Sequence, residues 1–272
     1  MTSLESTTTQ IPLSLRLPFR MERAELLKLR KSRGVWLPLA LLTVGAIIVT
    51  YTALELFHLS NSSKYGPAGG TEKFQVALIL LGQIGGMIAV GLVGAAAGTQ
   101  DLSSRVYRDL VSSGRSRARL YLARAAGGLA LVLPFVAAAY ALAAVLSVVL
   151  AGGLATPSVA LYVKAGLWVL LSAGVVYLLA LGLGSLIGSR GAAISVLIAY
   201  LIPVQGILHA IGALGKSRDA LLSVAMEGLS PLPPSDTGTL ILPSHATALI
   251  VLALWVGVFG GLGLWRTLTR DA

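Results

Sequence analysis

Six long apolar stretches dominate this sequence and constrain what it can fold into. They cover roughly residues 35–57, 75–98, 125–151, 163–187, 191–212 and 246–265. Each stretch is close to the ~20 apolar residues that a helix needs to cross ~30 Å of hydrocarbon. Charged residues make up only 12% of the chain, against about 25% in a soluble domain. Because so few charges cannot coat a soluble surface of this size, the sequence predicts an all-α polytopic membrane protein with six transmembrane helices.

The remaining segments divide the chain simply. Residues 1–34 are a predicted cytoplasmic tail with an interfacial helix, and residues 35–272 are one six-span domain. Only Gly188-Ser189-Arg190 separates the fourth and fifth stretches, which predicts a tight helical hairpin. The last external loop is the longest, at 213–245, and within it a short helix is predicted to begin at Asp219, a residue type that caps helix N-termini.

The basic residues predict the orientation of the spans, because cytoplasmic loops of membrane proteins carry an excess of Lys and Arg. Sixteen of the 21 basic residues fall on one side of the predicted topology. They are Arg16, Arg20, Arg23, Lys28, Arg30, Lys31, Arg33, Arg105, Arg108, Arg115, Arg117, Arg119, Arg124, Arg190, Arg266 and Arg270. We therefore expect both termini in the cytoplasm. Topology and attraction to anionic lipid account for the net charge of +10 without nucleic acid.

The segment at 17–33 predicts a basic helix before the first span. It has a modest apolar stripe, and Glu25 precedes Lys28 by three residues, a spacing that supports a helix. Such a helix would lie along the inner membrane interface, with Lys28 and Arg30 toward lipid phosphates. The alternative is a simple basic flank before the first span.

The loop at 99–124 contains more than a connection between two spans requires. Residues 102–112 predict a short amphipathic helix, which Ser112-Ser113-Gly114 would end. Its apolar face is formed by Leu102, Val106 and Leu110, and its polar face by Arg105, Arg108 and Asp109. We interpret this helix as a docking surface for a soluble partner. The alternative is a helix that rests on the lipid surface.

The residues that most enzymes use are absent or poorly placed. The chain has no cysteine, and its three histidines lie far apart in the sequence, which argues against thiolate chemistry and a His-based metal site. Residues 210–217, AIGALGKS, match a relaxed phosphate-loop pattern, but they follow a membrane span rather than a buried strand. An intramembrane serine protease would need an activated serine, and no G-x-S occurs within a span. We expect no catalytic site and no bound cofactor in this chain.

The polar residues in the middle of the spans are neutral. A carrier driven by an ion gradient normally keeps ionisable groups there, so uphill transport by this chain would need energy from another subunit. Gln83 and Gln205 could line a translocation path or could bond between helices. Glycine pairs four residues apart, such as Gly94 with Gly98 and Gly257 with Gly261, predict close helix packing.

Two stretches carry a resemblance to a known family. MERAELLKLRKSRGVWLPLALL at 21–42 and RVYRDLVSSGRSRARLYLAR at 105–124 resemble the basic N-terminal approach and the coupling-helix segment of type-2 ABC exporter permeases. These permeases are typical of bacterial efflux of, or immunity to, drugs, lantibiotics and antimicrobial peptides. The number of spans agrees over almost the whole chain. Gln100-Asp101 stands where that family often has a Glu-x-x-x-Gly-Thr run, so Asp101 would take the acidic role.

The resemblance implies a permease subunit of the plasma membrane that works as a dimer, with a second copy or a related permease. Two separate ABC ATPase subunits would bind ATP and magnesium and drive export of an amphipathic drug, peptide or lipid-like molecule. The resemblance assigns coupling to 102–112. A membrane scaffold or sensor subunit that holds a soluble partner by the same loop is the alternative.

Overall fold

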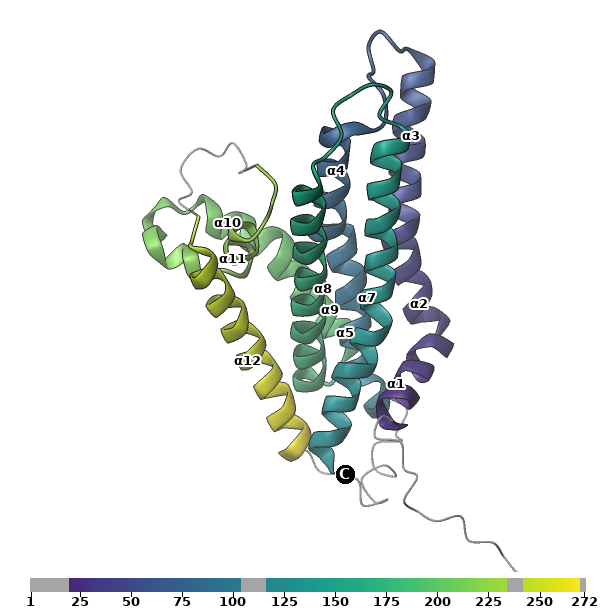
Figure 1. The fold of residues 1–272 in the computed structure, drawn as a ribbon. Coiled ribbons are helices and arrows are strands. Elements are labelled where there is room, and N and C mark those ends of the chain that lie inside the picture. Colours follow the sequence, from purple (N-terminus) through teal and green to yellow (C-terminus); the bar gives the residue numbers. More distant parts are fainter. Residues whose placement is uncertain (1–19, 104–115, 234–241, 270–272) are drawn as a thin grey trace, which may run out of the picture.

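The computed structural model describes residues 20–103, 116–233 and 242–269, and every regular element in these ranges is a helix. The fold is therefore the all-α fold that the apolar stretches predict (Figure 1). The elements are α1 (Arg20–Lys31), α2 (Arg33–Ala40), η1 (Leu41–Gly45), α3 (Ala46–Ser60), α4 (Gly70–Gly82), α5 (Gly85–Ser103), α7 (Arg117–Val149), α8 (Val159–Ile187), α9 (Arg190–Ala199), η2 (Tyr200–Val204), α10 (Gln205–Ala210), η3 (Gly212–Ala220), α11 (Leu222–Gly228) and α12 (His245–Thr269).

Six helical segments are long and apolar enough to span a membrane. They are Arg33–Ser60, Gly70–Asp101, Arg117–Val149, Val159–Ile187, Arg190–Leu208 and His245–Thr269. Each contains most of one predicted span. We call the end of the bundle where α5 ends and α7 begins the basal end, and the opposite end the apical end. The helix α1 and the end of α12 both lie at the basal end (Figure 1).

The second and fourth spans form the centre of the bundle because glycine lets their backbones touch. A Cβ added to Gly98 of α5 would lie 2.6 Å from the Leu181 carbonyl oxygen of α8, and one on Gly94 would lie 2.5 Å from that of Tyr177. Small residues permit such close approach between membrane helices. In contrast, Gly257 and Gly261 on α12 have nothing within 4 Å, so this pair packs against no other part of the described chain.

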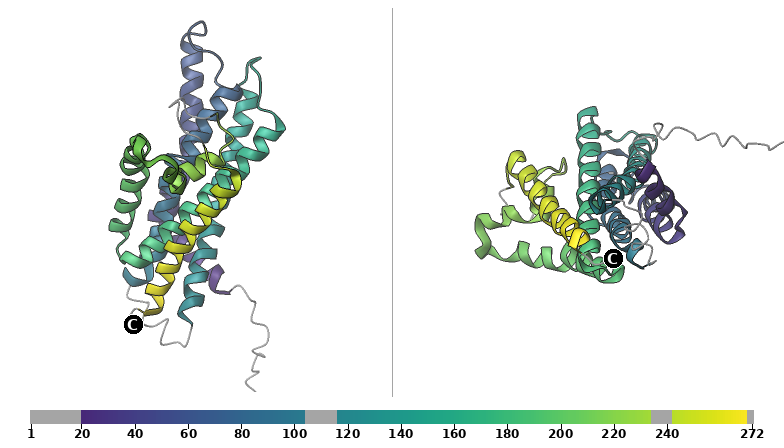
Figure 2. Two further views of the ribbon diagram at one scale, coloured as in Figure 1. Left: turned by 90° about the vertical axis from the view of Figure 1, so that its left-hand side faces the viewer. Right: turned by 90° about the horizontal axis from the view of Figure 1, so that it is seen from below.

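The other helices surround this centre on two sides. Seen from below, α12 and the region of α10 lie on one side of α8, and α1, α2 and α3 lie on the other (Figure 2). Outward-facing side chains on these outer helices are large and apolar, as in Val49, Leu59, Ile250 and Leu254, which are all exposed. Such a surface suits contact with lipid, not water.

Three spans depart from a regular α-helix. The second is two helices, because Gln83 and Ile84 interrupt it between α4 and α5. The first and fifth each contain a π-helical turn, η1 after Pro38 and η2 around Pro203, since proline removes a backbone donor and widens the local turn. The helix of the fifth span ends at Ala210, close to the predicted end near 212, and the 3₁₀ helix η3 begins at Gly212.

The short helix predicted in the last long loop forms, although not with the predicted start. Its first residue is Leu222, and the residue that precedes it is Leu221, not Asp219, which belongs to η3. Leu222, Val224 and Ala225 are buried, so packing rather than a polar cap positions α11.

Candidate functional site

A cluster of four charged side chains lies at the basal end, within the bundle. The Lys28 ammonium of α1 donates a hydrogen bond to Asp101 Oδ1 at 2.6 Å and lies 2.7 Å from Glu25 Oε2. Arg124 of α7 donates from Nε to Asp101 Oδ2 at 3.0 Å, and its Nη2 lies 2.7 Å from the same oxygen. Asp101 therefore binds two cations that come from two different helices. We call these four residues the basal charge cluster.

Burial makes the central pair of this cluster energetically important. Asp101 is 4% exposed and Arg124 is 2% exposed. An ion in such a place loses its hydration, and only a well-placed partner of opposite charge compensates for that loss. Because each charge needs the other, the cluster holds α1, α5 and α7 in one arrangement.

Several packing contacts place the members of the cluster. The α1 helix lies against α7, where Gly127 leaves room: a Cβ there would be 2.8 Å from Glu25 Cβ. Leu29 of α1 is fully buried beside this contact. On α7, the Arg124 carbonyl accepts a hydrogen bond from the Tyr177 hydroxyl of α8 at 2.7 Å. The fourth span thus also holds the arginine in position.

The cluster joins the two ends of the predicted coupling segment. Asp101 lies in the last turn of α5, immediately before that segment, and Arg124 lies in the second turn of α7, twelve residues after Ser112. The predicted coupling residues Arg105, Val106, Arg108, Asp109 and Leu110 lie outside the described residues. Leu102 belongs to the last turn of α5, and its side chain also lies outside what the structure describes.

The helix predicted within 17–33 forms as α1, Arg20–Lys31, but one of its residues does not have the predicted role. The pair of Glu25 with Lys28 forms as the spacing predicts. Lys28, however, points to Asp101 within the protein and not toward lipid phosphates, because a buried carboxylate lies within its reach. Arg30 is exposed and remains a candidate for contact with phosphates.

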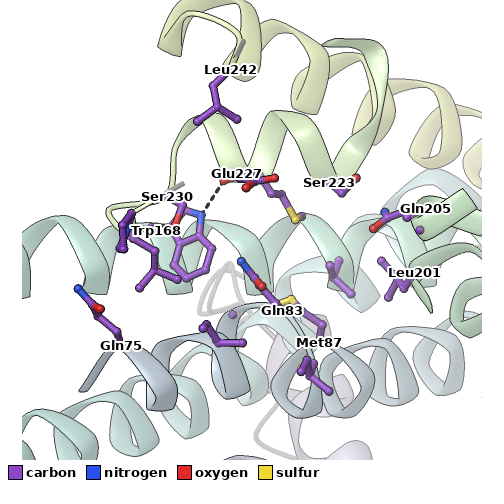
Figure 3. A pocket seen from close by; sticks show the side chains of 18 residues that line it. Gln75, Gln83, Met87, Trp168, Leu201, Gln205, Ser223, Glu227, Ser230 and Leu242 are labelled. Carbon is purple, nitrogen blue, oxygen red and sulfur yellow. Dashed lines mark hydrogen bonds between the residues drawn. The ribbon is translucent and has the colours of Figure 1, made fainter. Parts of the chain in front are cut away.

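A second site is a pocket of 460 Å³ in the apical half of the bundle. It lies where α4 breaks from α5 and is covered by α11, with α8 and α10 as its sides (Figure 3). The structure brings Gln83 and Gln205 together here, 122 positions apart in the sequence, as two of the residues that line the pocket. Whether this pocket belongs to a translocation path stays a prediction.

Trp168 forms a fixed wall of the pocket. Its indole nitrogen donates a hydrogen bond to the Met226 carbonyl at 2.8 Å, which ties α8 to α11. Its ring fills the space beside Gly82, where an added Cβ would lie 2.4 Å from the ring. Glycine at the end of α4 is therefore required for the ring to lie there.

The sequence reasoning missed three features of these sites: the Asp101–Arg124 pair, the break at Gln83, and Trp168 and Glu227 as pocket residues. The run Gly82-Gln83-Ile84-Gly85-Gly86 carries a signal for the break, since glycine weakens a helix. No local signal indicates the pair, because its members lie 23 positions apart and meet only when α5 packs on α7.

Neither site resembles a metal centre. Within the described ranges no three His, Asp or Glu residues are grouped so that they could hold a metal ion. No protein-family model matches this chain, and no curated protein matches it. The function proposed below therefore rests on the sequence pattern and on the geometry of these two sites.

Proposed function

We propose that this chain is the permease subunit of an ATP-driven ABC exporter of the type-2 class. It would form a dimer with a second copy or a related permease, and separate ATPase subunits would supply the energy. The observation that carries the proposal is the basal charge cluster, which fastens α1 to the two helices that enclose the predicted coupling segment.

The charge distribution supports a cytoplasmic basal end. Basic residues of the described ranges gather there on four segments: α1, the start of α7, the α8–α9 turn and the end of α12. Acidic lipid and the positive-inside rule both favour that end in the cytoplasm. An ATPase that consumes cytoplasmic ATP would therefore meet the coupling segment on the correct side.

The cluster gives a physical route from the partner to the spans. A force on residues 102–112 would reach α5 directly, because Asp101 is adjacent to the segment. The ion pairs of Asp101 with Arg124 and with Lys28 would carry it to α7 and to α1. Because the pair is buried and compact, the ends of these helices would move together rather than bend independently. The broken span α4–α5 and the π-turns of the first and fifth spans are places where such motion could be absorbed.

Reconstitution tests this proposal. The chain is co-expressed with each ABC ATPase that neighbouring genes are found to encode, and the purified complex is placed in proteoliposomes. We expect co-purification and ATP-dependent transport that stops when the ATPase carries a substitution of its catalytic glutamate. Failure of every neighbouring ABC ATPase to co-purify would contradict the proposal.

The alternative, a scaffold or sensor subunit, makes a different prediction in the same assay. It requires that the partner co-purifies through the 102–112 segment but that no ATP-dependent transport occurs. Measurement of transport therefore separates the two functions.

A further inference from the structure

The apical pocket has walls that suit an amphipathic organic molecule. Most of the residues that line it are apolar, and they come from five separate elements of the fold. These residues are Ile79, Ile84, Met87, Trp168, Val176, Leu201, Met226, Leu232, Pro233 and Leu242. Pockets of several hundred Å³ with mostly apolar walls and a few polar groups are typical binding sites for small molecules.

The polar residues of the pocket specify the charge of that molecule. Gln75, Gln83, Gln205, Ser223 and Ser230 are neutral, and Glu227 is the single charged residue among the described residues that line it. Glu227 and Ser223 come from α11, on the wall opposite Gln83 (Figure 3). A carboxylate at the edge of an apolar space attracts a cation and repels an anion.

Gln205 adds a requirement of its own. Its side chain is 9% exposed, and its Nε2 atom has two hydrogens to donate, of which the neighbouring Tyr200 hydroxyl can accept one. A buried amide donor without an acceptor is costly, since its hydration is lost without replacement. A ligand with a carbonyl or ether oxygen at this position would supply that acceptor.

An inorganic cation fits these features poorly. Metal ions such as Mg²⁺ and Ca²⁺ take six or more oxygen ligands, whereas one carboxylate and amide groups on separate helices line this pocket. Trp168, in contrast, suits an organic cation, because indole is the side chain whose face attracts cations most strongly. The two methionines add polarisable walls that adapt to flat apolar groups.

We propose that the apical pocket binds an amphipathic organic cation, with Glu227 as its counter-ion and Gln205 as the donor to an oxygen of the ligand. As the substrate class of the exporter, this rests on the proposed function, but binding itself requires only this chain. The apical position places the ligand in the half of the bundle that the proposed orientation puts toward the outer leaflet.

Two dyes that share one aromatic body test the proposal. Rhodamine 6G is a cation with an ester group, and rhodamine B carries a free carboxylate that makes it a zwitterion. Binding of each dye to the purified chain in nanodiscs, without an ATPase, is measured by fluorescence anisotropy. We expect saturable binding of rhodamine 6G at least tenfold tighter than that of rhodamine B.

Substitutions then assign the preference to the pocket. Glu227→Gln should weaken rhodamine 6G about tenfold, the scale of a hydrogen bond to a charged group, and should reduce the preference between the dyes. Gln205→Met should weaken both dyes several-fold and leave the preference intact. Glu55→Gln removes a carboxylate in α3, outside the pocket, and should change neither value.

The ratio of the two affinities protects the test against misfolding, because a loss of folded protein lowers both signals equally. Absence of saturable rhodamine 6G binding, equal binding of the two dyes, or an unchanged ratio in Glu227→Gln would overturn the proposal. Co-purification of an ATPase is scored on separate samples. If the ATPase co-purifies but rhodamine 6G does not bind, only the assignment of the ligand is wrong. If rhodamine 6G binds but no ATPase co-purifies, only the assignment as an exporter is wrong.

Discussion

Removal of Asp101 should destabilise the protein more than removal of Asp101 together with Arg124. In Asp101→Leu, the Arg124 guanidinium stays 2% exposed but loses its carboxylate partner. Breaking a buried ion pair by removal of one partner costs about 3–5 kcal/mol. Lys28 adds little to this cost, because it is 28% exposed and keeps Glu25 at 2.7 Å.

The double change Asp101→Leu with Arg124→Met removes both charges and keeps apolar volume. Replacement of a buried ion pair by apolar residues is often close to neutral, so we expect a loss of about 1–2 kcal/mol. The bond from Tyr177 to the Arg124 backbone carbonyl does not depend on the side chain and should persist. The free energies of unfolding of the two variants should therefore differ by about 2–3 kcal/mol, and the double variant should be the more stable.

Reversible unfolding in mixed micelles of dodecyl maltoside and SDS, followed by circular dichroism, measures both free energies. Glu72→Leu is the control, since Glu72 is an exposed acid in the first turn of α4, and it should cost less than about 1 kcal/mol. A cost below about 1 kcal/mol for Asp101→Leu, or a double variant that is no more stable than Asp101→Leu, would refute this account of the cluster.

Three further predictions concern topology, packing and nucleotide. In intact cells an impermeant thiol reagent should label Ser62→Cys in the apical loop and should not label Ser189→Cys in the basal turn. The chain has no native cysteine that could react. The reverse labelling pattern would show that the orientation is opposite to the one proposed. Gly98→Val should destabilise the isolated chain by about 1–3 kcal/mol, since its side chain would press on the α8 backbone. Gly257→Val, which has open space, should leave the same unfolding measurement unchanged. Lys216→Ala should keep the ATPase activity of the complex within about twofold of the unsubstituted complex. The reason is that AIGALGKS ends in the 3₁₀ helix η3 and not in the strand, loop and helix of a phosphate-binding loop. A loss of activity of ~10³ would show that this loop takes part in phosphate chemistry.

The number and approximate position of the spans could be predicted because hydrocarbon imposes one length on every helix that crosses it. The thickness of the hydrocarbon does not determine where a span bends. The break at Gln83 lies inside a predicted span, and Trp168 of another helix packs beside Gly82 at this point. Such a contact between distant residues leaves no periodic mark in the sequence.

The basal charge cluster shows a second limit of sequence reasoning. Arg124 and Lys28 have a sufficient explanation as topology signals, so nothing in the sequence requires a partner for them. Their pairing with Asp101 arises because Gly127 admits α1 against α7 and Gly98 admits α8 against α5. The acidic residue itself could be singled out, since it is a lone acid at the end of an apolar span.

The most direct test of the exporter proposal is the double substitution Val106→Asp with Leu110→Asp. If these residues are the apolar anchors of a docking helix, two buried charges at the interface should abolish co-purification of the ATPase and all ATP-dependent transport, since a few buried anchors carry most of the energy of an interface. Ser116→Asp, which adds one charge at an exposed position beside α7, should preserve both. A double variant that inserts, retains its ATPase and transports at the normal rate would contradict the proposal.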